Sequence, residues 1–322
     1  GICAMLPPRL QPFFRAEARD TALADNKVHD TLLSMQATSL RLRGGILRLE
    51  VHTLPPAEAG DVVVALEAAG ICRTDLAVIA GAIPVAEGRT PGHEGCGRVV
   101  SVGGGAEEWL GRRVTLLPSV EDARFGIDRD GAFTDHIITP AGALVLLPEQ
   151  LSSLRGAFVE PVAATLGALA AAPPKSERGV IVGTGRIAEL TFRVLTAAGY
   201  DVCCDDAPPE DRFAWGIDAT LAGEALLRLC RAVRPGGLVV LKSRCEGAVP
   251  LPLTLCQRKE LVLRPVGWGP FAKAIALLQD PAFAVEGRFG EAAPLEDFLN
   301  LFERSRDEDG KKEFFRLSTE FR

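Results

Sequence analysis

The chain has 322 residues, a formal net charge of −6 and a pI near 5.4, with 47% hydrophobic and 24% charged residues. This composition is typical of a globular protein, and the length predicts two domains rather than one. We expect no nucleic-acid partner, because no basic patch stands out, and no membrane span, because no apolar run reaches roughly 18 residues.

Residues 1–34 are interpreted as an N-terminal extension that precedes the first regular stretch at Met35. The extension holds four basic and four acidic residues, whereas transit peptides are poor in acids, so a targeting role is not favoured. The eight cysteines of the chain show no framework spacing. They predict reduced thiols in a reducing compartment, either the cytoplasm or an organellar matrix. The role of the extension stays open.

Short apolar runs alternate with turn signals in the first half of the chain, which predicts strands. The expected strands are residues 46–54, 61–69, 97–105 and 112–118, and after a polar loop at 119–132 the run 133–148 continues the pattern. The first part of the chain, 35–161, is therefore predicted to be a β-rich domain.

From about residue 160 the pattern changes to alternating helices and strands, with a helical composition at 159–172. Strands are predicted at 179–183, 200–206, 215–221, 237–243 and 261–268, and helices at 186–199, ending at Gly199, and at 224–237, ending at Pro-Gly-Gly. This alternation is typical of a parallel, doubly wound sheet, so the predicted fold class is α/β. Two amphipathic helices (270–278 and 294–305) and a last strand (311–318) are expected near the end.

A glycine-rich turn, GTGRIA, follows the predicted strand 179–183 and opens the next helix. Gly183 allows the tight turn, Gly185 lets a pyrophosphate approach the backbone, and Ala188 permits close helix–strand packing. The helix start then offers free N–H groups to the phosphates. An acid at the end of the following strand would bind the adenosine ribose and favour NAD over NADP. We prefer Asp206 for this role and keep Asp205 as the alternative.

A cysteine and a histidine in the β-rich part are suitable zinc ligands. Cys72 lies in GICRTD and His93 in GHEG, and a thiolate with an imidazole is a ligand pair that zinc favours. A catalytic zinc site takes three protein ligands and keeps one position open. Glu94, adjacent to His93, and Glu160, in VEPVA, are both candidates for the third ligand, and the sequence leaves this choice open.

Two further side chains of GICRTD have predicted roles at such a site. Asp75 is expected to accept the second ring N–H of His93 and so to fix the tautomer of that ring. Thr74 is expected to pass a proton from the substrate alcohol toward the ribose of the cofactor.

On six motifs that occur in the family's order, the chain resembles the zinc-type medium-chain dehydrogenase/reductase superfamily, which includes alcohol, sorbitol, threonine and glucose dehydrogenases. The motifs are GICRTD, GHEGCGRVVSVG, DGAF, VEPVA, VIVGTGRIA and RPGGLVVLKS. The resemblance covers residues 35–322. It implies a GroES-like catalytic domain over 35–161, completed by 270–322, and a Rossmann NAD-binding domain over 162–269.

The resemblance also implies roles for individual residues. Cys72 and His93 match the first two zinc ligands, and Glu160 matches the position where family members use either Cys or Glu. Glu94 matches a neighbouring glutamate that reaches the metal in some members. Thr74 matches the hydroxyl that contacts the reacting oxygen.

Four features concern the cofactors or depart from the family pattern. Arg73 occupies the place where some alcohol dehydrogenases contact the cofactor pyrophosphate. Ala77 stands where many relatives carry the histidine that ends the proton relay. Residues 104–159 contain no cysteine, so one catalytic zinc and no structural zinc is expected. Only eight residues separate Asp206 from the next predicted strand, which predicts a shortened Rossmann domain.

These features together predict a zinc-dependent, NAD(H)-linked alcohol or polyol dehydrogenase. Its partner would be a small alcohol or carbonyl substrate, and it would act as a homo-oligomer or as a subunit of a larger assembly. The alternative is a non-catalytic accessory or structural subunit that retains the dehydrogenase fold. A zinc-free reductase of the same superfamily is a third interpretation. The sequence does not indicate the substrate.

Overall fold

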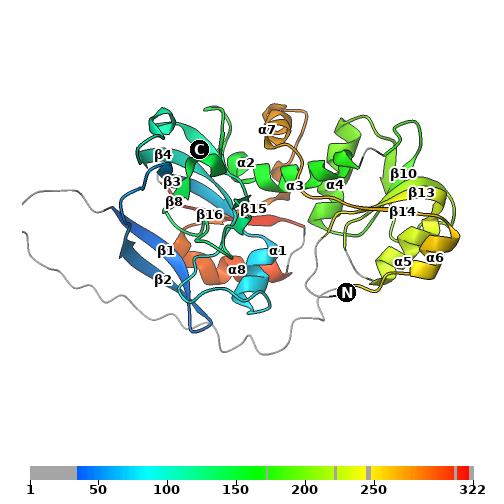
Figure 1. Ribbon diagram of the computed structural model, residues 1–322, viewed down its shortest axis with the longest axis horizontal. Coiled ribbons are helices and arrows are strands. Elements are labelled where there is room, and N and C mark those ends of the chain that lie inside the picture. The colour runs from blue at the N-terminus through cyan, green and yellow to red at the C-terminus, as the bar shows by residue number, and fades with distance from the viewer. Residues whose placement is uncertain (1–34, 172, 221–222, 244–247, 308–309, 319–322) are drawn as a thin grey trace, which may run out of the picture. The chain divides into compact units, whose positions relative to one another are not determined.

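A computed structural model describes residues 35–171, 173–220, 223–243, 248–307 and 310–318 (Figure 1). The described residues form two units. The first contains the residues before Phe158 together with 289–307 and 312–318, and the second contains Phe158–Arg288 with 310–311. The predicted N-terminal extension, 1–34, lies outside the described residues. Within them, no helix is long and apolar enough to cross a lipid bilayer.

The first unit is built on a mostly antiparallel sheet with the strand order β15-β16-β3-β4-β5-β9, in which β8 also pairs with β3. These strands are β3 (Asp61–Gly70), β4 (Glu94–Val102), β5 (Arg113–Leu116), β8 (His136–Pro140), β9 (Leu144–Leu146), β15 (Phe289–Ala293) and β16 (Lys312–Arg316). Two hairpins, β1 (Gln36–Arg43) with β2 (Ile46–Thr53) and β6 (Ser119–Val120) with β7 (Ala123–Arg124), accompany the sheet.

Short helices complete the first unit: α1 (Arg73–Ile79), α2 (Ser153–Ala157), α8 (Phe298–Asp307), and the 3₁₀ turns η3 (Glu107–Trp109), η4 (Ala141–Ala143) and η6 (Leu295–Asp297). A cluster of aromatic rings joins α8 to the sheet, because Phe133, Phe302 and Phe315 are fully buried with ring centroids 4.9–5.9 Å apart. Such tilted pairs add to the stabilisation that burial itself supplies. The β-rich first domain expected from the sequence is present.

The end of β3 brings three distant stretches of the chain together. Gly70, its last residue, pairs with Glu94 at the start of β4 and with Phe314 in β16. Because neighbouring strands lie about 4.8 Å apart, the sequences GICRTD, GHEG and KKEFF meet at this edge of the sheet. The strand pairing therefore explains how residues that lie far apart in sequence share one site.

The second unit is built on a parallel sheet which, among the described residues, has five strands in the order β11-β10-β12-β13-β14. They are β10 (Gly179–Val182), β11 (Val202–Cys204), β12 (Phe213–Asp218), β13 (Val233–Leu241) and β14 (Val262–Pro265). Its helices are α3 (Val159–Ala170), α4 (Arg186–Ala197), α5 (Gly223–Ala232), α6 (Leu253–Arg258), α7 (Phe271–Gln279) and the 3₁₀ turn η5 (Glu286–Arg288).

Helices cover both faces of this sheet, as expected for a doubly wound fold. Ile181 in β10 packs into a cluster with residues of α3 and α4, whereas its neighbours Val180 and Val182 pack into a second cluster with α5 and α6. Successive strand residues point to opposite faces, so the sheet separates two cores. Figure 1 shows α5 and α6 together along β13 and β14. The predicted α/β class with a Rossmann-type parallel sheet is confirmed.

The predicted shortening of this unit is also visible. Residues 205–212, all of which the structure describes, form no helix or strand between β11 and β12. As a result β11 lies at the edge of the sheet, next to β10. A six-stranded Rossmann sheet carries another strand beyond this position.

Two expectations about helices differ from the structure. The helix predicted to run to the Pro-Gly-Gly at 235–237 ends earlier, at Ala232, and β13 begins at Val233. Pro235 explains this, since proline disfavours helical backbone at the residue before it. The helix α1 in GICRTD was not predicted. The unit edges also differ from the expected ranges, because α7 packs against α3 of the second unit.

Candidate functional site

The segment GICRTD folds into the start of α1, and this local structure orients Cys72. Cys72 is the N-cap residue with extended backbone (φ −108°, ψ 160°), and its N–H donates to the Asp75 carboxylate at 2.8 Å. This is one half of a capping box, which satisfies backbone groups that a helix start leaves free. The capping bond between Cys72 and Asp75 therefore fixes the backbone of Cys72 and with it the orientation of its side chain.

The same carboxylate also orients His93. Asp75 is 1% exposed, and its second oxygen, Oδ1, accepts the N–H of Gly92 at 3.1 Å and lies 3.1 Å from Nδ1 of His93. An ionised carboxylate only accepts hydrogen bonds, so Nδ1 carries the proton and Nε2 is the nitrogen available to a metal. Asp75 therefore contacts both Cys72 and His93.

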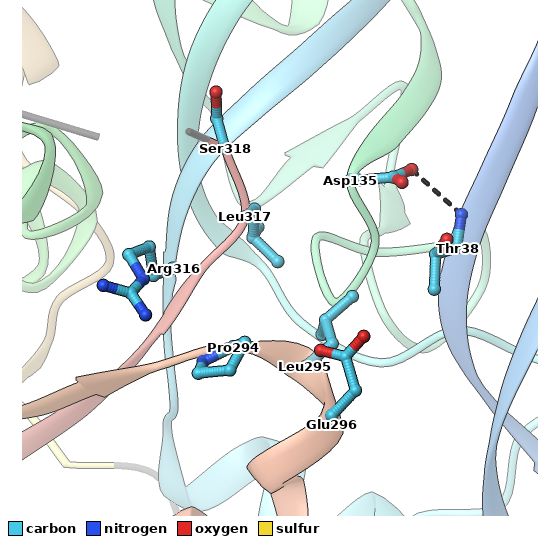
Figure 2. A pocket seen from close by; sticks show the side chains of 8 residues that line it. All are labelled: Thr38, Asp135, Pro294, Leu295, Glu296, Arg316, Leu317 and Ser318. Atoms are coloured by element: carbon cyan, nitrogen blue, oxygen red, sulfur yellow. Dashed lines mark hydrogen bonds between the residues drawn. The ribbon is translucent and has the colours of Figure 1, made fainter. Parts of the chain in front are cut away.

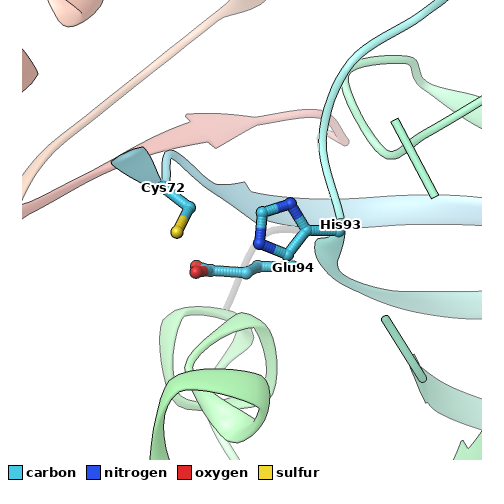
Figure 3. A group of neighbouring side chains, drawn as sticks. All are labelled: Cys72, His93 and Glu94. Carbon is cyan, nitrogen blue, oxygen red and sulfur yellow. The ribbon is translucent and has the colours of Figure 1, made fainter. Parts of the chain in front are cut away.

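Three side chains converge at the end of β3. The donor atoms of Cys72, His93 and Glu94 all lie within 4.8 Å of one another, and Figure 3 shows the three side chains directed toward a common point. Among the described residues, this is the one group of acidic, cysteine and histidine side chains with metal-binding spacing. A thiolate, an imidazole and a carboxylate match the ligand types of zinc. The donor set therefore fits a zinc ion.

His93 is buried, and its surroundings favour the protonated ring in the absence of a metal. Burial lowers the pKa of His93, but the charge and hydrogen bond of Asp75, with a further contribution from Cys72, outweigh it and hold the pKa well above its ordinary value. A cation that binds Nε2 must displace this proton. Binding of a metal at this site is accordingly coupled to proton release.

Glu94 has a partner that the sequence analysis did not find. The Lys312 ammonium forms an ion pair with Glu94 Oε2 and donates to the carbonyl oxygen of Ile71 at 3.2 Å. The side chains of Glu94 and Lys312 are 1% and 3% exposed, so the pair is fully removed from water. Gly70 leaves room for it, because a Cβ there would lie against the Glu94 carboxylate and 3.1 Å from Cδ of Lys312.

The other predicted residues of α1 lie beside the cluster or on the surface. The Thr74 hydroxyl is 4.0 Å from the sulfur of Cys72, which places it next to a potential ligand. Arg73 is exposed and Ala77 is half-buried. The methyl group of Ala77 offers no site for proton transfer.

Glu160 belongs to the second unit, where it lies in the first turn of α3. Its carboxylate accepts the indole N–H of Trp268 at 2.5 Å. Trp268 follows β14, and the backbone N–H of the next residue, Gly269, donates to Ala163 of α3 at 2.7 Å. The position of the Glu160 carboxylate is therefore set by a tryptophan that the sequence analysis missed.

The glycine-rich turn of the second unit has the backbone that a phosphate-binding loop needs. Gly183 and Gly185 have φ of +136° and +91°, in the region that favours glycine. Gly185 is the N-cap of α4, whose first N–H groups have no partner within the helix. Ala188 is 3% exposed and packs in the core between α4 and the sheet.

The two acids after β11 differ in their contacts. Asp206 accepts the N–H of Gly183 through Oδ1 at 2.9 Å, so its carboxylate is attached to the glycine turn. Asp205 instead accepts the N–H of Ala207 at 2.9 Å. The glycine turn therefore has an acid next to its first glycine, and that acid is Asp206.

A separate pocket of about 520 Å³ lies in the first unit (Figure 2). It is lined by Thr38, Asp135, Pro294, Leu295, Glu296, Arg316, Leu317 and Ser318. The Asp135 carboxylate accepts the N–H of Thr38 at 3.0 Å, so part of the polar lining is already satisfied. None of the predicted site residues lines this pocket.

Comparison with known proteins agrees with this architecture. Residues 58–149 match the alcohol dehydrogenase GroES-like domain family. The chain is 27% identical to an alcohol dehydrogenase from Moraxella over 56% of this chain and 60% of that protein. It is 30% identical to (R,R)-butanediol dehydrogenase from Bacillus subtilis over 51% of this chain and 56% of that protein. The alignments thus span little more than half of these relatives.

The whole fold has a counterpart among solved structures. Acetophenone reductase from Geotrichum candidum, in complex with NAD, superposes with a TM-score of 0.77 at 15% identity, covering 89% of this chain and 98% of that chain. Residues 58–149 thus match an alcohol dehydrogenase GroES-like domain, and the chain as a whole resembles the medium-chain dehydrogenase/reductase superfamily in fold.

Proposed function

We propose that this protein is a zinc-dependent, NAD(H)-linked alcohol or polyol dehydrogenase. The observation that carries the proposal is the convergence of Cys72, His93 and Glu94 within 4.8 Å in a GroES-like domain. Relatives in sequence include enzymes named alcohol dehydrogenase and butanediol dehydrogenase, which supports an alcohol or a diol as the substrate class.

Cys72 and His93 would hold the zinc ion. When bound, zinc supplies a Lewis acid that polarises the substrate oxygen, and the nicotinamide supplies the hydride acceptor. The contribution of the chain is to keep the sulfur and Nε2 of His93 oriented, which Asp75 does through its bonds to both residues. Partners of this kind typically change metal affinity 10–100-fold.

The Thr74 hydroxyl is the group that accepts the substrate proton. It lies next to the sulfur of Cys72, and a hydroxyl can accept one proton while donating another. The next step toward solvent would pass through water, because Ala77 has no group that exchanges protons. We therefore expect slower proton release than in relatives with a histidine at this position.

The third ligand is Glu94 or Glu160, and both carboxylates have a competing partner. Glu94 lies in the cluster but is paired with Lys312, and Glu160 accepts the Trp268 indole N–H. Glu94→Gln and Glu160→Gln, each titrated with Co²⁺, distinguish the two. The variant that lacks the ligand shows a changed absorption spectrum, whereas the other keeps the spectrum of the parent.

NAD rather than NADP is the proposed dinucleotide, and it would bind the turn at Gly183 and Gly185. The Asp206 carboxylate next to Gly183 supports this choice, because a second negative charge repels a 2′-phosphate. Arg73 is the candidate for a pyrophosphate contact. The six described cysteines are free, which supports a reducing compartment, and we propose a homo-oligomer or a subunit of a larger assembly.

Metal analysis and binding test the proposal directly. The purified protein should contain about one zinc per chain, bind NADH, and oxidise alcohols or vicinal diols with NAD. Cys72→Ser should lose both the metal and the activity. Cys96→Ser is the matched control, because Cys96 is buried in the same unit and a serine can also donate to the carbonyl of Ser153.

The alternative function, an accessory subunit that retains the fold, predicts different results. The shortened second unit and Ala77 are the features that favour it. In that case NADH would leave the melting temperature unchanged, since a ligand that binds the folded state must stabilise it. One zinc per chain, no change of the melting temperature with NADH and a stable larger assembly would together exclude the dehydrogenase proposal.

A further inference from the structure

Residues 310–311, here called the strap, belong to the second unit, whereas 289–307 and 312–318 belong to the first. Two arginines hold the backbone of the strap. Arg186 donates from Nη1 to the carbonyl oxygen of Lys311 at 2.5 Å, and Arg288 donates from Nη1 to that of Gly310 at 3.4 Å. Both strap carbonyls are therefore hydrogen-bonded.

Both arginines are tied to the first turn of α4, the helix that follows the glycine turn. Arg186 is the residue directly after Gly185 and is only 9% exposed. Arg288 forms an ion pair with Glu189, which also lies in this turn. The strap is thus attached to the part of the molecule where the diphosphate of a dinucleotide would bind.

The residue after the strap is Lys312, whose ammonium is paired with Glu94. The carbonyl of Lys311 and the N–H of Lys312 belong to one planar peptide group. A bond that fixes the carbonyl therefore also fixes the nitrogen and the Cα of Lys312. Arg186 is in this way connected to Glu94 by one hydrogen bond, one rigid peptide and one ion pair.

We propose that Arg186 is a positioning residue that couples dinucleotide binding to metal binding. This inference rests on the proposed function. A diphosphate at the N-terminus of α4 attracts the Arg186 guanidinium, because a guanidinium binds a charged phosphate more strongly than a neutral carbonyl. The Lys311 carbonyl is then released, Lys312 gains freedom, and the Glu94 carboxylate can turn to the metal. Dinucleotide binding should consequently tighten metal binding.

The test measures the dissociation constant of Co²⁺ for the metal-free full-length chain, with and without saturating NAD. In the parent, NAD should lower this constant about fivefold or more, the usual lower range of coupling between sites. Arg186→Met lacks the bond to the Lys311 carbonyl whether or not NAD is bound, so it should bind Co²⁺ alone about as tightly as the parent binds it with NAD, and the ratio should fall to about one. Arg186→Lys, which keeps the charge and one donor group, should restore part of the ratio.

Arg193→Met is the matched control. Arg193 lies on the same helix and also donates to a backbone carbonyl, but that carbonyl belongs to Ala284 rather than to the strap. The control should keep the ratio of the parent. An unchanged ratio in Arg186→Met, or an equal loss in both variants, would overturn the proposal.

The experiment separates this inference from the proposed function. If the parent binds neither Co²⁺ nor NAD, both ideas fail. If it binds both ligands and the ratio is one, the inference fails and the proposed function stands. Should Arg186→Met not fold, as judged by its melting curve, Arg186→Lys carries the test, and a ratio equal to that of the parent in this variant would overturn the proposal.

Discussion

Asp75 and His93 are joined by a hydrogen bond of 3.1 Å, and the same carboxylate caps the helix that begins after Cys72. One buried side chain thus orients two proposed metal ligands that come from different elements. Because all its bonds are made to N–H groups, their geometry requires a carboxylate that acts as an acceptor only. Replacement of one Asp75 carboxylate oxygen by an amide nitrogen should therefore disrupt this arrangement.

Asp75→Asn should weaken metal binding by about 10–100-fold, the usual effect of removing a partner of a metal-binding histidine. The amide would turn an N–H toward His93 or toward a backbone N–H, so at least one of the bonds is lost. Competition with a chelator of known affinity measures the change. Asp61→Asn, on the same sheet but away from the cluster, should leave the affinity as in the parent.

Lys312→Met should destabilise the metal-free protein by about 3–5 kcal/mol, because it leaves the Glu94 carboxylate buried without a counter-charge. Urea unfolding with and without Zn²⁺ measures the loss. Zinc should reduce it, since the freed carboxylate gains a cation as its partner.

A second substitution checks this cause. The double variant Lys312→Met/Glu94→Gln removes the buried charge, so it should be more stable than Lys312→Met alone. If both variants are equally unstable, lost packing of the lysine side chain rather than an unpaired charge is responsible.

Asp206→Asn should reduce the preference for NADH over NADPH by on the order of tenfold, because it removes the charge that repels a 2′-phosphate and binds the ribose. Fluorescence titration with both cofactors gives the two dissociation constants. Asp205→Asn is the matched control, since Asp205 bonds to the N–H of Ala207 rather than to the glycine turn. A larger effect at Asp205 would reverse our assignment of the two acids.

Cys230 should make the second unit sensitive to alkaline pH. Burial, with the neighbouring Cys256, raises the pKa of Cys230 to about 12, whereas an unfolded thiol titrates near about 8.5. Its contribution to stability is complete below the unfolded value and is lost as the pH rises toward the folded one. Between pH 8 and pH 10.5 we expect a loss of about 2 kcal/mol.

The change in unfolding free energy over this interval, measured in urea, should be smaller in Cys230→Ala by that amount. Other groups also titrate in this range, so the comparison between the two proteins, not the loss in either alone, carries the result. An identical pH dependence in both would show that the thiol is not responsible.

Local patterns allowed much of the fold to be predicted. The periodicity of residues 186–199 gave α4, and the glycines at 183 and 185 marked the turn before it, because these features depend on neighbouring residues alone. The eight residues after Asp206 likewise indicated that the sheet lacks a strand. The helix after Cys72 was missed, since its seven residues are too few for a periodic pattern.

Partners from distant parts of the chain could not be predicted in this way. Lys312 meets Glu94 only because β16 pairs with β3, and Trp268 meets Glu160 only because the segment after β14 packs on α3. The position of Lys312 in a predicted strand, close to two phenylalanines, was a weak signal for a buried ion pair. Nothing in the sequence around Glu160 indicated an indole partner.

The edge position of β11 has a consequence for the far end of a bound dinucleotide. With no further strand beside it, the adenine ring would have protein on one side and water on the other. Groups attached to that ring should then cost little affinity. NAD tethered to a resin through its adenine should therefore capture the protein, whereas NAD tethered through its ribose should not. The protein would then recognise the dinucleotide mainly through its phosphates and its nicotinamide, and the adenine would contribute little to the affinity.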